Sequence, residues 1–223
     1  MINPHLNIFL RRSEFHLLSE SESDMPAKGT RTRNKVIYEA LQLFSVKGYF
    51  HTSISDILNA TELTKGGLYC HFQSKEDIWY AVYEEAVRIW RMTVFKGMRQ
   101  IDDPLLRLDR TCNNVLRRYL AQDTFDGGCF FVNMLVELSG QSASMSRHIL
   151  RGFVGFARLF QSWLVEADQQ GQLRSGIGVR EAANFLVIAL NGAATLYVSS
   201  RDKTVLQLTA GQIHFYIQQL MKA

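Results

Sequence analysis

Apolar residues recur at helical spacing along most of the chain, and this periodicity constrains the fold more than any other feature. Between residues 30 and 47, Val36, Ala40, Leu41 and Phe44 fall on one face of a helix, with charged residues opposite. No β-rich run of any length interrupts the pattern. The sequence therefore predicts an all-α protein. Longer helices are predicted over residues 104–121, 128–140, 143–169, 179–200 and 203–221.

A chain of 223 residues that is 47% hydrophobic has enough apolar material for a core. Its three cysteines are odd in number and have no paired spacing, which favours a reducing compartment. The first residues do not fit a secretory signal, because the apolar piece precedes Arg11 and Arg12. The richest apolar run, 182–198, contains polar residues and is shorter than the roughly 20 residues of a membrane span. We predict a cytoplasmic protein with no membrane partner.

Three short helices precede Ser74, where a longer helix begins. Gly48 ends the first, Ser53 caps the second, and Thr64 caps a third that covers residues 65–71. A tight connection joins the last two of these helices. This arrangement is typical of a helix-turn-helix.

The third helix contains two adjacent glycines, in the stretch TELTKGGLYCHF. Each glycine costs about 1 kcal/mol relative to alanine in a helix interior. A helix lying in the DNA major groove would explain that cost, because the missing side chains of Gly66 and Gly67 let the backbone approach the duplex. Thr64 and Lys65 stand at the helix start, where they can reach phosphates or base edges. An ordinary loop is the alternative interpretation of the glycine pair.

Positive charge is concentrated in the same segment. Residues 28–75 carry seven lysines and arginines against three acidic residues, while the whole chain has a net charge of +4. Such a distribution suits a polyanionic partner, although a surplus of this size is also common on ordinary surfaces.

The order and spacing of these residues resemble a known family. Residues 40–79, ALQLFSVKGYFHTSISDILNATELTKGGLYCHFQSKEDIW, are similar to the DNA-binding domain of the TetR/AcrR family of bacterial transcriptional regulators. The matching residues are Phe44, Gly48-Tyr49, Thr52-Ser53, Asp56-Ile57, Thr64-Lys65-Gly66, Leu68-Tyr69, Phe72 and Ser74-Lys75-Glu76. The turn departs from the family pattern, because Thr61-Glu62 stands where Ala-Gly is common. Either a glutamate at that place occupies a strained left-handed conformation, or the turn differs slightly from the family's.

The resemblance implies a set of DNA-contacting residues and a mechanism. By position the contacts are Thr52, Ser53, Thr64, Lys65, Gly66, Tyr69, His71 and Lys75, with Arg33 as a further phosphate contact. Family members usually bind palindromic operators in double-stranded DNA as dimers, and release them when a small-molecule effector enters the C-terminal region. The resemblance thus implies a ligand-responsive repressor. Activation in place of repression stays open, as do the operator, the regulated genes and the effector.

These considerations divide the chain into three parts. We expect a flexible N-terminal extension over residues 1–27 (with Met25 as an alternative start), a helix-turn-helix DNA-binding domain over 28–74, and a ligand-binding and dimerisation domain over 75–223. Helix 179–200 is apolar almost all round, which predicts burial on more than one face. We expect a homodimer through helices 179–200 and 203–221. A central core helix in a monomer is the alternative.

Aromatic and sulfur-containing residues between positions 104 and 169 are candidates to line a ligand cavity. They are Phe125, Cys129, Phe130, Phe131, Met134, Phe153, Phe156, Phe160 and Trp163. Plain hydrophobic core is the simpler interpretation of any one of them. Cys129 and Cys70 are also candidates for oxidation sensing, although nothing nearby in the sequence indicates an activated thiol.

Two other classes of protein compete with a DNA-binding regulator. An enzyme is disfavoured, because the sequence has no HExxH, no phosphate-binding glycine loop after a strand and no nucleophile elbow. The six histidines show no clustered metal-ligand spacing, so we predict neither a metal nor a cofactor. The second rival is a helical scaffold or ligand carrier that does not bind DNA.

Overall fold

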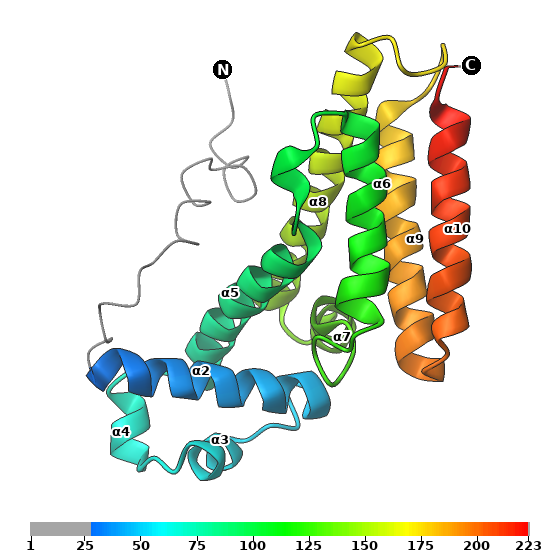
Figure 1. Ribbon diagram of the computed structural model, residues 1–223. Helices are drawn as coiled ribbons and strands as arrows, with labels where there is room; N and C mark the ends of the chain where they lie inside the picture. Colours follow the sequence, from blue (N-terminus) through cyan, green and yellow to red (C-terminus); the bar gives the residue numbers. More distant parts are fainter. Residues whose placement is uncertain (1–27, 223) are drawn as a thin grey trace.

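The computed structural model describes residues 28–222 and is helical along almost all of that range (Figure 1). In chain order the elements are α2 (Lys28–Lys47), α3 (Ile54–Thr61), α4 (Lys65–Tyr69), α5 (Lys75–Val94), the 3₁₀-helix η3 (Met98–Gln100), α6 (Pro104–Asn114), the π-helix η4 (Val115–Leu120), α7 (Phe130–Leu138), α8 (Ala143–Gln169), α9 (Val179–Ser200) and α10 (Lys203–Leu220). The all-α prediction is confirmed. The N-terminal extension expected over residues 1–27 lies outside the described residues.

Local capping explains where three of the N-terminal helices begin. The Asp56 N–H donates to the Ser53 hydroxyl at 3.0 Å, and the Ser53 N–H donates to the Asp56 carboxylate at 2.7 Å. This capping box starts α3, and its hydrogen bonds hold the pKa of the Asp56 carboxyl well below its usual value. Thr64 and Ser74 start α4 and α5 by accepting the N–H three residues further on. These three predicted starts are confirmed.

The predicted helix over residues 104–121 is divided in the structure. α6 ends at Asn114, whose side-chain Nδ2 donates to the carbonyl of Val94 at 2.8 Å in the interior. The chain then continues as the wider π-helical turn η4, which buries Tyr119 and Leu120. A helical hydrophobic period does not reveal such a turn, because the pattern of buried positions changes by only one residue.

The helices form two regions that share a continuous core. Figure 1 shows α2, α3 and α4 together at one end, with α5 leading from them into an upright bundle of α6, α8, α9 and α10. α7 lies near the C-terminal end of α2. Buried residues extend from Phe44 of α2 through Trp79 of α5 to Leu190 of α9. α5 therefore belongs to both regions, and the division at residue 75 stays a prediction.

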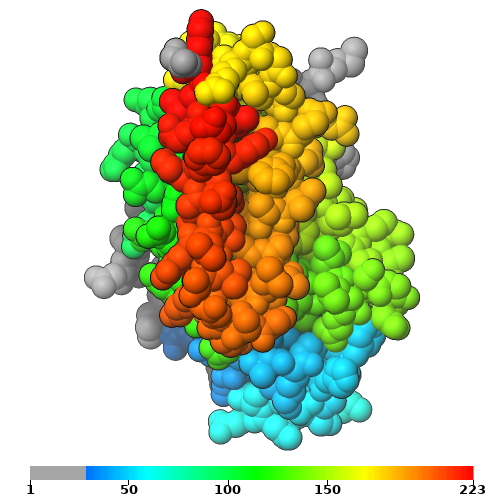
Figure 2. All heavy atoms as spheres, turned by 90° about the vertical axis from the view of Figure 1, so that its right-hand side faces the viewer, coloured from blue at the N-terminus to red at the C-terminus, as the bar shows by residue number. Residues whose placement is uncertain are grey.

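Helix α9 packs against both α8 and α10 and is buried on part of its surface. It is long and apolar enough to cross a membrane by length and composition, with a mean hydropathy of 1.4, but core helices of soluble proteins pass the same test. Figure 2 shows α9 and α10 side by side on one face of the molecule. Their exposed apolar side chains, here called the α9–α10 face, are Phe185, Ile188, Leu196, Leu208 and Phe215.

Candidate nucleic-acid interface

Helix α4 presents a short exposed edge at the end of the molecule, beneath the N-terminal part of α2 (Figure 1). Thr64, Lys65, Gly66 and Tyr69 are exposed along this edge. Leu68 is fully buried and anchors the helix in the core. The edge therefore combines a hydroxyl, an ammonium group, bare backbone and a phenol on one surface.

The two glycines of α4 have different environments. A Cβ atom added at Gly66 would have nothing within 4 Å, so the protein itself does not require glycine there. A Cβ at Gly67 would lie 3.3 Å from the Thr64 Oγ1, which accepts the Gly67 N–H at 3.2 Å. Gly67 thus donates to the N-cap residue Thr64. A side chain at position 66 would instead extend into open space outside the protein.

Three more predicted contacts lie around this edge. Arg33 on α2 is exposed and places its guanidinium 5.1 Å from the centroid of the Phe72 ring. His71 is half-buried beside the start of α2, where a Cβ on Gly29 would lie 3.8 Å from its ring. Ser53 is exposed at the start of α3, with its hydroxyl engaged in the capping box.

Thr52 and Lys75, which sequence reasoning placed among the DNA contacts, have internal partners in the structure. Thr52 has no exposed surface, and its hydroxyl donates to the Gly48 carbonyl at 2.7 Å. The Lys75 ammonium donates to the carbonyls of Tyr49 and Thr52 at 2.9 and 3.0 Å, and burial lowers its pKa. Both residues hold the loop between α2 and α3, because the Thr52 hydroxyl and the Lys75 ammonium bind backbone carbonyls of that loop.

The turn between α3 and α4 has the expected unusual geometry. Glu62 has φ 56° and ψ 29°, which is the left-handed conformation, the first of the two alternatives for this position. Its N–H donates to the Leu58 carbonyl and closes the helix. Its carboxylate lies 3.8 Å from the Lys35 ammonium, and both side chains are exposed.

A cavity of about 60 Å³ lies within the second region, where α5, η4, α8 and α9 meet. Its wall includes Tyr83, Val87 and Trp90 of α5, Tyr119 of η4, Phe153 and Phe156 of α8, and Leu190, Asn191 and Ala194 of α9. Cys129 and Phe131, at the start of α7, complete one side. The wall is almost wholly apolar, as expected of a small-molecule site.

Comparisons with known proteins agree with this geometry. Residues 36–82 match the family described as "Bacterial regulatory proteins, tetR family", and residues 104–213 match "Tetracyclin repressor-like, C-terminal domain". The chain is 30% identical over 167 residues to the HTH-type transcriptional repressor DhaR of Mycobacterium sp. (strain GP1), covering 74% of this chain and 81% of the relative. This chain belongs to the TetR family.

Other relatives extend the similarity over nearly the whole length. The HTH-type transcriptional repressor ComR of Escherichia coli (strain K12) is 24% identical over 197 residues, covering 84% of this chain and 90% of ComR. A crystal structure of a TetR transcriptional regulator from Chloroflexus aurantiacus J-10-FL has a TM-score of 0.81 at 26% identity, covering 87% and 98% of the two chains. The TetR-family chain described here is a DNA-binding transcriptional regulator.

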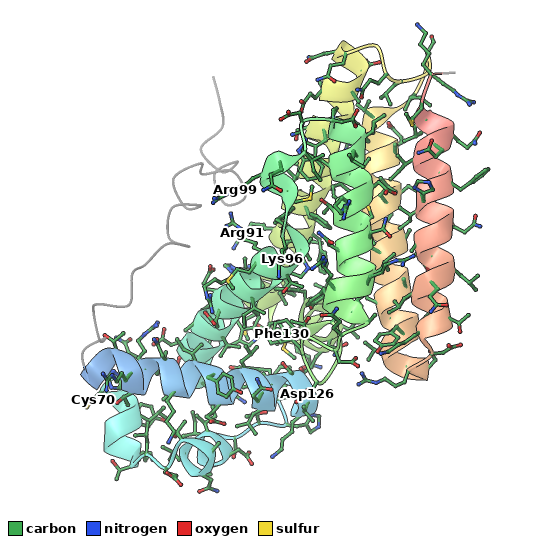
Figure 3. The ribbon with its side chains drawn as sticks, viewed as in Figure 1. Cys70, Arg91, Lys96, Arg99, Asp126 and Phe130 are labelled. Carbon is green, nitrogen blue, oxygen red and sulfur yellow. The ribbon has the colours of Figure 1, made fainter. Side chains whose placement is uncertain are left out.

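The cavity of this TetR-family chain differs in part from the predicted one. Cys129, Phe131, Phe153 and Phe156 line it. The other candidates are buried residues outside its wall: Phe125, Phe130, Met134, Phe160 and Trp163. Phe130 illustrates the reason, because its ring packs against Phe125 and Phe131 in the core beside α7 (Figure 3).

Sequence reasoning missed the cavity residues contributed by α5, η4 and α9. Tyr83, Trp90 and Tyr119 follow ordinary helical stripes, and only the packing of four elements brings them together. Only Asn191 could have been suspected as a cavity residue from the sequence, because it is a polar residue within an apolar helix.

The two buried cysteines carry no activated thiol. Cys129 is buried, and burial raises the pKa of its thiol. Burial also raises the pKa of the Cys112 thiol. Since the thiolate is the reactive form, neither buried residue is poised for oxidation. Cys70 is exposed at the end of α4.

A junction between α7 and the loop after α2 links the cavity region to the DNA-binding helices. The Glu137 carboxylate accepts the backbone N–H groups of Tyr49 and Phe50 at 2.9 and 2.8 Å. Gly48, at φ 84°, leaves room for that carboxylate, since an added Cβ would lie 2.6 Å from it. Nearby, Gly127 packs directly on the backbone of Ser45, and Figure 3 places the neighbouring Asp126 at the end of α2. Nothing in the local sequence around Glu137 indicated this role.

Proposed function

We propose that this TetR-family regulator is a repressor that binds a palindromic operator as a homodimer and leaves it when a small molecule enters the cavity. The exposed edge of α4 carries the proposal, because Gly66, which has no side chain, lies there with open space outside the protein. DhaR and ComR, both described as transcriptional repressors, support the direction of regulation. We place the regulator in the cytoplasm.

The proposed DNA contacts are the accessible members of the predicted set. They are Arg33, Ser53, Thr64, Lys65, Gly66, Tyr69 and His71. Lys65 and Arg33 supply positive charge for phosphates. Thr52 and Lys75 act indirectly, by holding the loop that leads into α3.

Selection from random duplex DNA with the full-length protein tests this function. We expect one enriched palindromic sequence, and binding that weakens with salt because phosphate contacts release counterions. Lys65→Ala should reduce operator affinity by about tenfold, since a hydrogen bond to a charged group contributes roughly 1.5–3 kcal/mol. Lys96→Ala is the matched control, because Lys96 is an exposed lysine far from α4 (Figure 3). No enriched sequence, or equal binding by both variants, would contradict the proposal. A promoter fusion then separates repression from activation.

We place the dimer contact on the α9–α10 face. Five large apolar side chains are exposed there on two neighbouring helices. Gly192 and Gly211 lie on the same face, and an added Cβ at either would have nothing within 4 Å. Small residues between large apolar ones let two helix pairs approach closely, and exposed apolar surface of this kind is typical of a protein interface.

Ile188→Asp should therefore shift the equilibrium from dimer to monomer. Ile188 is 69% exposed in the single chain, so the substitution costs little in the monomer. In the dimer it would bury an unpaired carboxylate, and we expect the dissociation constant to rise at least about tenfold. Sedimentation velocity measures the result. Leu106→Asp on α6, at an exposed apolar residue outside the α9–α10 face, is the control. A wild type that is monomeric at micromolar concentration would refute this assignment.

Release of the operator requires that the effector prefer the arrangement that does not bind DNA, by about 1–3 kcal/mol. Two elements connect the cavity with the DNA-binding helices. α5 contributes cavity residues and begins at Lys75, which holds the loop before α3. α7 begins with cavity residues and carries Glu137, which binds the same loop. We propose that both transmit the change.

A further inference from the structure

The cavity wall carries no charged side chain among the described residues. Its polar side-chain groups are the hydroxyls of Tyr83 and Tyr119, the thiol of Cys129, the amide of Asn191 and the indole N–H of Trp90. Glu84 and Arg151 lie close enough to Tyr83 to influence its pKa, but neither contributes to the wall. A charged ligand would therefore enter an apolar interior without a partner of opposite charge, which is strongly unfavourable.

The titratable groups of the wall are neutral at physiological pH. Burial raises the pKa of the Tyr83 and Tyr119 hydroxyls and of the Cys129 thiol. None of the three then supplies a negative charge for a cationic ligand, and no group of the wall supplies a positive charge for an anionic one. The electrostatics of the wall select a neutral molecule.

The polar groups of the wall differ in whether they can still form a hydrogen bond with a ligand. The Tyr119 hydroxyl donates to the Cys129 sulfur at 3.5 Å. The Tyr83 hydroxyl lies against α8 at Gly152, where an added Cβ would be 2.7 Å from it. The Asn191 Nδ2 donates to the Val187 carbonyl at 2.9 Å, which orients the amide along α9. The Asn191 Oδ1 is then available to accept a hydrogen bond from a ligand.

The cavity is so small that a ligand would have to expand it. At about 60 Å³ it is smaller than the roughly 150 Å³ of an apolar cavity that takes up benzene. A molecule with one ring would have to push the walls apart. Three of the wall residues belong to α5, so this expansion would displace the helix that leads to the DNA-binding region.

We infer that the effector is a small, neutral, largely hydrocarbon molecule with a hydroxyl group that donates to the Asn191 Oδ1. The role of this ligand as the effector rests on the proposed function, but its binding to the cavity does not depend on DNA. The wall chemistry excludes carboxylates and amines of the same size, because their charge would be unpaired.

Calorimetric titration of the full-length protein with four probes tests the inference. All four probes are a benzene ring with one carbon substituent. The probes are benzyl alcohol, toluene, benzoate and benzylamine. We expect benzyl alcohol to bind at least about tenfold more tightly than either charged probe, and more tightly than toluene. Equal or tighter binding of benzoate or benzylamine would overturn the assignment of a neutral ligand. Absence of benzyl alcohol binding at millimolar concentration would overturn the ligand class altogether.

Asn191→Ala tests the hydrogen bond, and Asn184→Ala is its matched control. Asn184 lies two turns earlier on α9 and makes the same bond, from its Nδ2 to the Arg180 carbonyl at 2.8 Å, but it is exposed and outside the cavity. Asn191→Ala should remove the preference for benzyl alcohol over toluene while toluene still binds, which shows that the variant is folded. An unchanged preference would overturn the role of Asn191. Benzyl alcohol that binds without weakening operator binding would support the ligand class and contradict the proposed function.

Discussion

Gly66→Leu should strongly weaken specific operator binding and leave the folded protein at least as stable as the wild type. Nothing in the protein lies within 4 Å of a Cβ at this position, so the side chain meets no obstacle in the absence of DNA. Leucine also favours a helix over glycine by up to about 1 kcal/mol. On DNA, the same side chain would hold the backbone of α4 away from the duplex. We expect operator affinity to fall about a hundredfold, which corresponds to about 2.7 kcal/mol.

Fluorescence anisotropy with the selected operator measures the affinity, and thermal unfolding measures the stability. Ser175→Leu is the control for an added exposed leucine, because Ser175 is exposed in the loop before α9. Gly66→Ala should give an intermediate loss. If Gly66→Leu bound the operator as tightly as the wild type, close approach of the α4 backbone would no longer explain the glycine.

The helix starts were predictable from sequence because capping is local. Ser53, Thr64 and Ser74 each accept an N–H only three residues away, so the signal and its structural consequence lie in one short window. The bounds of α8 and the start of α9 were equally accessible, since glycine-containing breaks lie before α8 and between α8 and α9. Both helices match the predicted ranges.

The cavity and the junction were less accessible because they depend on tertiary packing. Phe156 and Phe160 lie four residues apart on α8 and are both buried, yet only Phe156 lines the cavity. Hydrophobic periodicity identifies a buried face but does not identify the element that meets it. Lys75 shows a related limit, because its place in the family pattern does not distinguish a phosphate contact from a bond to the protein's own backbone.

Glu137→Ala should lower both the stability of the folded protein and its affinity for the operator. The substitution removes two charge-assisted hydrogen bonds to the backbone of Tyr49 and Phe50. Because the site is partly exposed, we expect a loss of about 1–3 kcal/mol in the free energy of unfolding. The freed loop leads directly into α3, so the position of α4 relative to the bundle becomes less defined. Operator affinity should fall about tenfold, which corresponds to about 1.4 kcal/mol.

A second carboxylate separates this effect from a general loss of stability. Glu166, near the far end of α8, forms an ion pair with Arg107 at 2.6 Å and has no contact with the DNA-binding helices. Glu166→Ala should lower the melting temperature to a similar degree and leave operator affinity unchanged. Glu137→Gln keeps one carbonyl acceptor and should lie between wild type and Glu137→Ala. Hydrogen exchange at the Tyr49 and Phe50 amides should accelerate only in the Glu137 variants. If affinity followed melting temperature across all three variants, the junction would stabilise the protein without positioning its DNA-binding helices.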